Sequence, residues 1–323
     1  MLTPCFETPE RAFSIVTTLR ASGYTDIRAP ETYGPDSYTR VHDQGYLRFL
    51  SEAWDAWSGS GRNGSALPLT WPVRGNVPAA PKSIDGLLGY YSMDTCAPIT
   101  AGTWAAACSS ADIALTGADY IRQGHRAAFA LCRPPGHHAG KDCMGGYCYL
   151  NNAALAAQRL RDSGAQRVAI LDVDYHHGNG TQHIFYDRSD VLFVSIHADT
   201  TVSYPFYSGW NDERGRGDGF GFNLNFPLPH GANWEVYEPV LRRGGNNILS
   251  HRPDALVVSL GVDTSVDDPI GRFDLRVDDY ARMGEMIGKL RLPTLLVMEG
   301  GYLVEQMAHN VITVISAFLE AHG

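Results

Sequence analysis

The sequence predicts an α/β fold: a three-layer α/β/α sandwich with a central, mainly parallel sheet that is covered by helices on both faces. Two observations support this prediction. Short apolar segments alternate with longer helical segments along the chain, which is the order that a parallel sheet requires. One apolar segment, ALVVSL, has the near-continuous hydrophobic character of a strand buried on both faces. The alternation and the buried strand together favour this class over an all-helical or all-β fold.

The elements can be followed most clearly from the middle of the chain onward. A helix is expected over 153–161, which is rich in Ala and Leu and is followed by a Ser-Gly stop. Apolar strands are expected at 168–173, 191–196, 255–260 and 294–298, and helices at 236–249, 279–290 and 304–319. The sequence contains no repeat, low-complexity segment or clear linker, so we expect a single domain over residues 1–323.

Composition narrows the class of protein. The chain has 35 acidic and 26 basic residues, a net charge of −9, which argues against a nucleic-acid partner and favours cationic ligands. The six cysteines form no CxxC pair and are read as reduced thiols. The sequence has no apolar run of membrane-spanning length and no signal peptide at its start. We therefore expect a cytoplasmic protein that binds no membrane.

The most informative segment is AILDVDYHHGNGT, in which an apolar strand leads into carboxylates and imidazoles. If the strand stays extended, Asp172, Asp174 and His176 point to the same face. Burying such a row without a cation is costly, because the like charges repel and each loses its hydration. Asp and His are ligands that zinc, iron and manganese accept, so the row predicts a divalent metal site.

Three further polar segments follow predicted strands, and in open parallel sheets active sites form beyond the carboxyl ends of the strands. They are Gly261-Val262-Asp263, the stretch RPPGHH at 133–138, and Glu299-Gly300-Gly301-Tyr302. Each has an ordinary alternative reading. Taken alone, Asp263 is a helix cap, the paired histidines are surface or core residues, and Tyr302 is a half-buried tyrosine. Their joint occurrence at strand ends favours one active site instead.

These segments carry a family resemblance. The blocks RPPGHHAG, GGYCYLNNAA, LDVDYHHGNGTQ, VSLGVDT and EGGY resemble those of the zinc-dependent histone deacetylase superfamily. Within it, the chain is most similar to bacterial acetylpolyamine amidohydrolases, a likeness that includes PCFETPERA, VHDQGYLRFLSEAWDAW, LGYYSMDTCAPITAGTW and YPFYSG. The resemblance implies the α/β/α sandwich and the hydrolysis of an N-acetyl amide, in a small cationic acetylated amine, to acetate and a primary amine.

The resemblance also implies a role for each motif residue. Asp174, His176 and Asp263 match the zinc ligands, although a set of two carboxylates and one imidazole also suits Fe²⁺ or Mn²⁺. The expected catalytic residues are His138 as general base, His137 as a more cationic neighbour held by Asp172, and Tyr302 as hydrogen-bond donor to the oxyanion.

Two structural potassium sites are implied in the same way. The first matches Asp172, Asp174, His176, Ser195 and Ile196. The second is built from carbonyl groups and matches Phe185, Arg188, Val191 and Phe222. Asn179 stands where some relatives have an aspartate that orients the second histidine. The acetylpolyamine branch also has an asparagine there. Because Asn lacks that charge, His138 is expected to be less basic than in a carboxylate-paired dyad.

Substrate preference is less completely determined by the sequence. Tyr147 and Tyr204 match aromatic walls of a substrate tunnel, with Gly146 beside them. Asp85 and Asp94 are candidate contacts for a distal ammonium, whereas Cys96 stands where relatives have a characteristic glutamate. Deacetylation of acetyl-lysine proteins or peptides, or hydrolysis of a xenobiotic amide, stays an alternative. The complete set of site residues disfavours a non-catalytic acetyl-ligand binding protein. A dinuclear manganese hydrolase is disfavoured because the motifs lack the additional bridging carboxylates and histidines that it needs.

The start of the chain differs from that of these relatives, which begin with a further strand and a loop that contacts substrate. This chain opens at PCFETPERA. We expect either that translation begins upstream or that the first strand is absent. The same loop helps relatives to dimerise, so a homodimer stays an alternative to a monomer.

Overall fold

The computed structural model describes residues 5–73 and 79–323 and is centred on one six-stranded sheet. The strands lie in the order β1-β6-β5-β2-β3-β4, and every neighbouring pair is parallel. This confirms the predicted α/β fold with a parallel sheet. Pro4, the first residue of the PCFETPERA block, lies outside the described residues. The strands are β1 (Ala127–Ala130), β2 (Val168–Asp172), β3 (Val191–Ala198), β4 (Asn223–Leu228), β5 (Ala255–Leu260) and β6 (Thr294–Met298).

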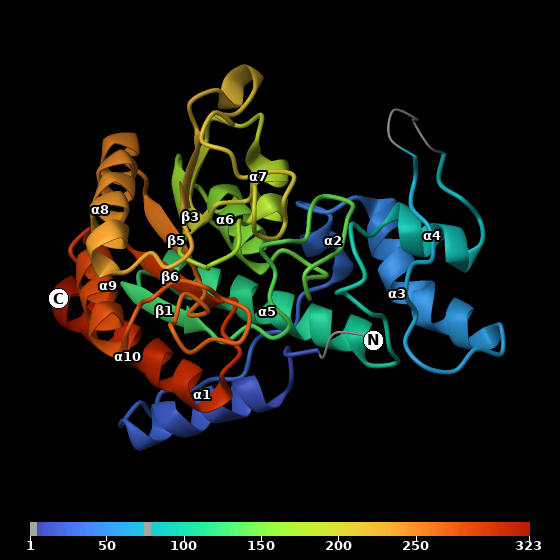
Figure 1. Ribbon diagram of the computed structural model, residues 1–323, viewed down its shortest axis with the longest axis horizontal. Coiled ribbons are helices and arrows are strands. Elements are labelled where there is room, and N and C mark those ends of the chain that lie inside the picture. The colour runs from blue at the N-terminus through green and yellow to red at the C-terminus, as the bar shows by residue number, and fades with distance from the viewer. Residues whose placement is uncertain (1–4, 74–78) are drawn as a thin grey trace.

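Helices cover both faces of the sheet (Figure 1). One face is covered by α5 (Thr103–Arg122), α6 (Asn152–Asp162) and α7 (Asn179–Phe185). The opposite layer contains α8 (Trp234–His251), α9 (Val277–Gly288), α10 (Val304–His322) and, packed on α10, α1 (Glu10–Ala21). The remaining helices are α2 (Pro35–Tyr38), α3 (Gln44–Gly59) and α4 (Ile84–Tyr90). Among the described residues, no helix is both long enough and apolar enough to cross a bilayer.

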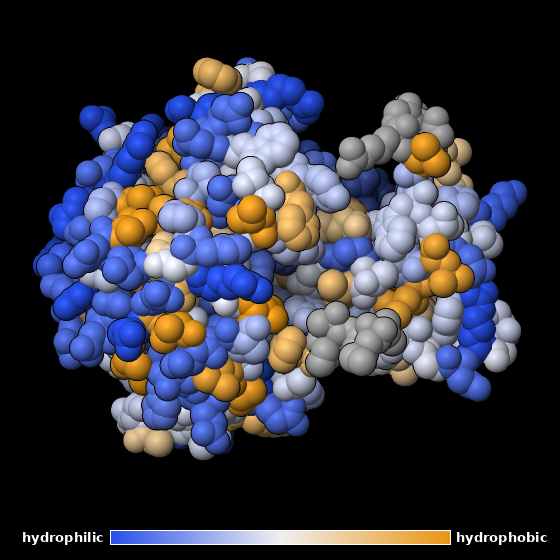
Figure 2. All heavy atoms as spheres, viewed as in Figure 1, coloured by the Kyte–Doolittle hydropathy of each residue, from blue (hydrophilic) through white to orange (hydrophobic). Residues whose placement is uncertain are grey.

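The strands supply two hydrophobic cores, one on each face, because successive side chains of a strand point in opposite directions. In β2, Ile170 packs into the core beneath α5 and α6, whereas Ala169 and Leu171 pack into the core beneath α8 to α10. All five residues of β2 are buried, as the uniformly apolar strand segments predict. On the face seen in Figure 2, hydrophobic side chains form separate patches among hydrophilic ones.

The predicted strands 255–260 and 294–298 match β5 and β6, and the other predicted elements differ only at their ends. Helix α8 begins two residues earlier than expected because the Asn233 side chain accepts a hydrogen bond from the amide of Val236 and caps it. The main correction concerns β2, which ends at Asp172. Asp172 Oδ1 accepts a hydrogen bond from the amide of Asp174, and Asp174 Oδ1 accepts one from the amide of His176. These side-chain turns end the extended backbone, so strand alternation does not explain where Asp174 and His176 point.

The strand order places a break in the winding direction at the centre of the sheet. The chain moves from β2 outward to β3 and β4, then returns to β5 beside β2 and moves outward to β6. The connection after β2 therefore leads to one side of the β2–β5 pair, and the connection after β5 leads to the other side. At such a switch point the loops beyond the carboxyl ends separate and leave a crevice, which is where open α/β sheets bind ligands. The segments after β2 and β5 carry the predicted metal ligands.

A stability prediction concerns Asp190, which precedes β3. Arg188 Nε donates to Asp190 Oδ1 over 2.9 Å, and Arg161 Nε donates to Oδ2 over 2.7 Å. Burial acts to raise the pKa of Asp190, but these hydrogen bonds outweigh it and lower the pKa to about 2. A carboxyl whose pKa is lowered by folding stabilises the protein above its unfolded pKa, and this contribution is lost as the pH falls from about 4 toward 2.

We therefore expect Asp190→Asn to reduce the free energy of unfolding at pH 7 by about 1 kcal/mol, a value that allows for solvent screening of the half-exposed pair. At pH 3 the difference from the unchanged protein should be smaller. Urea unfolding at both pH values measures it. Asp187→Asn is the matched control, because the ion pair of Asp187 with Arg216 is long and exposed. An equal difference at both pH values would contradict the prediction.

Candidate active site

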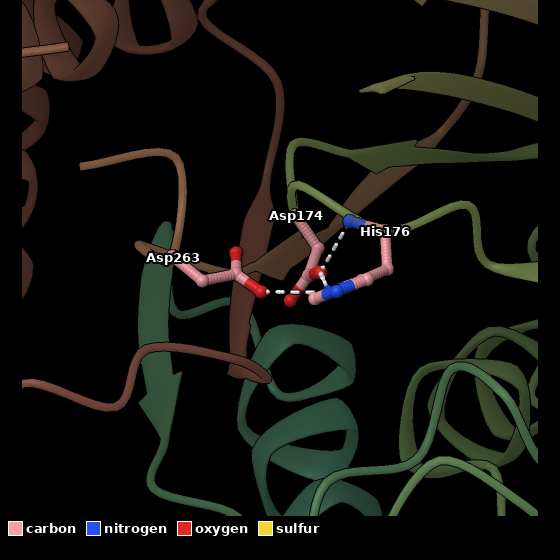
Figure 3. Close-up of side chains that lie close together, drawn as sticks. All are labelled: Asp174, His176 and Asp263. Atoms are coloured by element: carbon pink, nitrogen blue, oxygen red, sulfur yellow. Dashed lines mark hydrogen bonds and ion pairs between the residues drawn. The ribbon is translucent and has the colours of Figure 1, made fainter. Parts of the chain in front are cut away.

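Two carboxylates and one imidazole converge beyond the carboxyl ends of β2 and β5 (Figure 3). Asp174 and His176 lie in the turn after β2, and Asp263 follows β5. One ligand atom from each side chain lies within 4.8 Å of the others. His176 Nδ1 is 2.9 Å from Asp263 Oδ2 and 3.3 Å from Asp174 Oδ1. The structure thus brings together the three residues that the sequence analysis assigned to one metal.

Backbone amides orient both carboxylates. The amide of Gly300 donates to Asp174 Oδ2 over 2.8 Å, and the amide of Tyr175 donates to Asp263 Oδ1 over 2.9 Å. The close approach of Gly300 requires that it has no side chain, because a Cβ there would lie 2.5 Å from an oxygen of Asp174 and 2.5 Å from one of Asp263. The glycine of the EGGY motif therefore leaves room for the two acidic groups.

The donor set fits a divalent cation. Asp174 and Asp263 are fully buried at close range, so each is destabilised by lost hydration and by the other's charge. A cation with +2 charge would neutralise both, and a set of two oxygens and one nitrogen is one that zinc and related metals accept. Three protein ligands would leave coordination positions for water and substrate.

The paired histidines lie in different electrostatic environments. His137 Nδ1 is 3.0 Å from Asp172 Oδ2, and its Nε2 is 3.7 Å from Asp174 Oδ1. Burial acts to lower the pKa of His137, but the Asp174 and Asp172 charges outweigh it and raise this pKa well above its usual value. For His138, burial and the neighbouring His137 charge lower the pKa well below its usual value. One imidazole is therefore cationic and its neighbour neutral.

Asn179 determines the orientation of the neutral imidazole. Its Oδ1 accepts a hydrogen bond from His138 Nδ1 over 2.7 Å, while its Nδ2 donates to the sulfur of Met93. The amide orientation that satisfies both contacts assigns the proton of His138 to Nδ1. This leaves Nε2 as a hydrogen-bond acceptor. The asparagine therefore orients the imidazole without adding a negative charge.

Tyr302 is held by two residues that are distant from it in the sequence, Asp268 and Arg11. Its amide donates to Asp268 Oδ2 over 2.8 Å, and the guanidinium of Arg11 lies over its ring at 4.9 Å from the centroid. Arg11 Nε also donates to the carbonyl of Gly301 over 2.7 Å, and Arg11 Nη2 donates to the carbonyl of Glu299. Burial raises the pKa of Tyr302 well above its usual value, so its hydroxyl keeps its proton.

Sequence reasoning missed Arg11 and Asp268. Arg11 is buried together with Ile15 and Leu19 on one face of α1. A charged residue in register with an apolar stripe was a signal that could have identified Arg11, because an unpaired buried guanidinium is costly. Asp268 gave no comparable signal. Its role depends on Tyr302, which is 34 residues away in the chain.

The side chains of the site open into a cavity of about 510 Å³. Tyr147, Tyr204 and Gly146 line it, as the resemblance implied. Gly146 has φ +51°, and a Cβ on it would lie 2.4 Å from His138 Cδ2, so glycine lets this wall approach the imidazole. The other lining residues are Cys96, His138, Tyr175, His176, Val202, Ser203, Phe206, His230, Ile270, Arg272 and Tyr302.

The two acids predicted to contact a distal ammonium have other partners. Asp85 pairs with the guanidinium of Arg62 and does not line the cavity. Asp94 accepts hydrogen bonds from the hydroxyl of Tyr204 over 2.6 Å and from the amides of Gly146 and Cys96 over 3.0 and 2.7 Å. Asp94 therefore orients the tunnel wall, and the contacts of Asp85 and Asp94 with an ammonium stay predictions. Cys96 itself lines the cavity.

The residues of the first expected potassium site lie together behind the metal ligands. Asp172 and Ser195 are register partners in β2 and β3, and Ser195 Oγ is 2.8 Å from His197 Nδ1. Ile196 follows in β3. The second expected site spans the end of α7 and the start of β3, where the amide of Arg188 donates to the carbonyl of Phe185. Val191 begins β3, and the carbonyl of Phe222 accepts a hydrogen bond from the amide of Phe193. Both potassium sites stay predictions.

Comparison with known proteins gives the family. Acetylpolyamine amidohydrolase 2 of Pseudomonas aeruginosa is 53% identical over 320 residues, which cover 99% of this chain and 93% of that protein. Acetylpolyamine amidohydrolase of Mycoplana ramosa is 48% identical, covering 97% and 92% of the two chains.

The crystal structure of an acetylpolyamine aminohydrolase from Burkholderia pseudomallei, soaked with iodide, superposes with a TM-score of 0.95 at 42% identity. The match covers 100% of this chain and 93% of that one. Residues 5–318 match the family described as Histone deacetylase domain. With its parallel sheet, its convergent acids and imidazoles and these relatives, the chain belongs to the histone deacetylase domain family.

Proposed function

We propose that this protein is a metal-dependent amidohydrolase that removes the acetyl group from N-acetylated linear amines, with acetylpolyamines as its main substrates. The observation that carries the proposal is the convergence beyond the strand ends of the metal-ligand set, a histidine pair with one cationic and one neutral imidazole, and Tyr302, beside a cavity that His138, His176 and Tyr302 line. The names of the relatives from Pseudomonas aeruginosa and Mycoplana ramosa support the choice of substrate. The products are acetate and a free amine.

Asp174, His176 and Asp263 would hold the metal ion, with zinc as the proposed ion and Fe²⁺ or Mn²⁺ as alternatives. When bound, the metal supplies a Lewis acid that polarises the acetyl carbonyl. Potassium is proposed to have a structural role behind these ligands, at the oxygens near Asp172 and Ser195.

His138 acts as the general base. Its low pKa keeps it neutral at neutral pH, and Asn179 holds the proton on Nδ1, so Nε2 can accept a proton from the attacking water. The same imidazole then donates that proton to the nitrogen of the leaving amine. His137 stays protonated between Asp172 and Asp174, and its charge disfavours a proton on His138 before water attacks. The two histidines thus have separate roles.

Tyr302 donates a hydrogen bond to the oxygen that becomes negative as water adds to the carbonyl. Its raised pKa keeps the hydroxyl protonated, and Arg11 and Asp268 fix the peptide group that joins Gly301 to Tyr302. Tyr147 and Tyr204 line the cavity and provide apolar walls for a methylene stem. A linear substrate can therefore extend from the acetyl group toward the cavity mouth.

Tyr302→Phe tests the oxyanion donor. Removal of one such donor typically lowers kcat by about a hundredfold to a thousandfold, and we expect that loss here with no change in metal content. Steady-state kinetics on metal-reconstituted protein and elemental analysis measure the two quantities. Tyr186→Phe is the matched control, since Tyr186 does not line the cavity. Near-normal turnover by Tyr302→Phe would refute the assigned role.

Asp263→Asn tests the metal ligands. It keeps the size of the side chain but removes one anionic ligand, so we expect metal to be lost during dialysis and turnover to fall with it. Asp267→Asn changes an exposed acid four residues further along the chain. This variant should retain both the bound metal and the turnover. Mass spectrometry of the native protein gives the stoichiometry. A full complement of tightly bound metal in Asp263→Asn would exclude Asp263 as a ligand.

A panel of acetyl-amides tests the substrate class. We expect kcat/KM for N-acetylputrescine and N-acetylcadaverine to exceed that for an acetyl-lysine peptide, because the relatives from Pseudomonas aeruginosa and Mycoplana ramosa are named for acetylpolyamines, whereas the aromatic walls suit the stem of either substrate. Liberated acetate gives the rate. A strong preference for the peptide would favour the acetyl-lysine alternative, and no turnover of any acetyl-amide by metal-loaded protein would indicate a binding protein.

A further inference from the structure

Arg272 is the one permanently charged side chain that lines the active-site cavity in the described part of the chain. Its position is fixed by the backbone on either side. Asp268 Oδ1 accepts hydrogen bonds from the amides of Ile270 and Gly271, each over 3.0 Å. The carbonyl of Arg272 accepts a hydrogen bond from the amide of Gly231 over 2.7 Å. The residue is therefore anchored at its backbone while its side chain is exposed.

The guanidinium of Arg272 has no ion pair or hydrogen bond within residues 5–73 and 79–323. Many other arginines of the protein pair with a carboxylate, among them Arg62, Arg159 and Arg188. A guanidinium presents five N–H donors in a planar arrangement that matches a carboxylate. Arg272 thus offers an unused site of this kind inside the cavity where substrate binds.

The wall beside Arg272 is also suited to an acceptor. His230 precedes Gly231, whose amide bonds to Arg272, and both His230 and Ser203 line the cavity. Ser203 Oγ lies 2.7 Å from His230 Nε2 and 3.2 Å from the hydroxyl of Tyr175. These hydroxyl and imidazole groups can donate hydrogen bonds to a ligand oxygen. Among the described residues, this part of the cavity wall contains no carboxylate, so it can also accept an anion.

We propose that Arg272, with His230 and Ser203 beside it, forms a subsite for a carboxylate at the far end of the substrate. The enzyme would then also hydrolyse linear ω-acetamido carboxylates, in which an acetylated nitrogen and a carboxylate are joined by a methylene stem. This inference rests on the proposed function and widens its substrate class. Water adds to the acetyl carbon, the C–N bond breaks, acetate leaves, and the nitrogen takes up the proton from His138. The second product is a free amino acid.

The test compares substrates that differ in the far group alone. Metal-loaded protein is given 4-acetamidobutanoate and N-acetylputrescine, which have stems of similar length ending in a carboxylate and an ammonium. We expect turnover of both. Arg272→Gln should lower kcat/KM for the carboxylate substrate about fivefold to tenfold, the range for loss of a partly solvated charge-assisted hydrogen bond, and mainly through KM. The same variant should raise kcat/KM for N-acetylputrescine, because a repelling charge is removed.

Two variants serve as controls. Arg272→Lys keeps the charge and should retain most of the activity on the carboxylate substrate. Arg20→Gln removes an exposed arginine of α1 that does not line the cavity, and it should leave kcat/KM for both substrates unchanged. A fall for both substrates in Arg272→Gln, or turnover of N-acetylputrescine without turnover of 4-acetamidobutanoate, would overturn the inference. Turnover of neither substrate by the unchanged enzyme would instead contradict the proposed function, and the inference with it.

Discussion

The burial of two carboxylates at the centre of the sheet is the constraint on which the rest of the site depends. Asp174 and Asp263 follow β2 and β5, which are neighbours in the sheet, so the fold itself brings two like charges together. Their repulsion and desolvation favour a bound cation and require donors around them. The amides of Gly300 and Tyr175 meet that need, and the loop that supplies Gly300 also carries Tyr302. The charge of Asp174, together with that of Asp172, keeps His137 protonated, and burial and the charge of His137 keep His138 neutral.

Much of the fold was predictable because its strands are buried on both faces. The segments that form β5 and β6 are almost uniformly apolar, and their bounds follow from composition alone. Strand β4 (Asn223–Leu228) was harder to recognise, since it lies at a sheet edge and contains two asparagines and a proline. The end of β2 was placed one residue too late because the turns that end it are made by the carboxylates of Asp172 and Asp174.

The candidate site was predictable where its residues follow strands directly, as Asp174, His176 and Asp263 do. The contacts that depend on distant segments were not. Asp94 orients Tyr204, which lies 110 residues further along the chain, and nothing in the sequence indicated this hydrogen bond. The ion pair between Asp85 and Arg62 was equally hidden. Sequence spacing does not report such pairings, because they are set by how separate loops pack.

The hold of Arg11 on the Tyr302 loop links the two ends of the chain. Helix α1 packs on α10, and its arginine spans 290 residues of sequence to reach Gly301. Short-lived detachment of α1 would leave the sheet and the core beneath α5 and α6 assembled and would remove only Ile15 and Leu19 from the other core, yet it would release the backbone that positions the phenol. Catalysis in this molecule would therefore be more sensitive than spectroscopic measures of folding to partial opening. Loss of turnover on gentle heating would report the loosening of a peripheral helix before the protein melts.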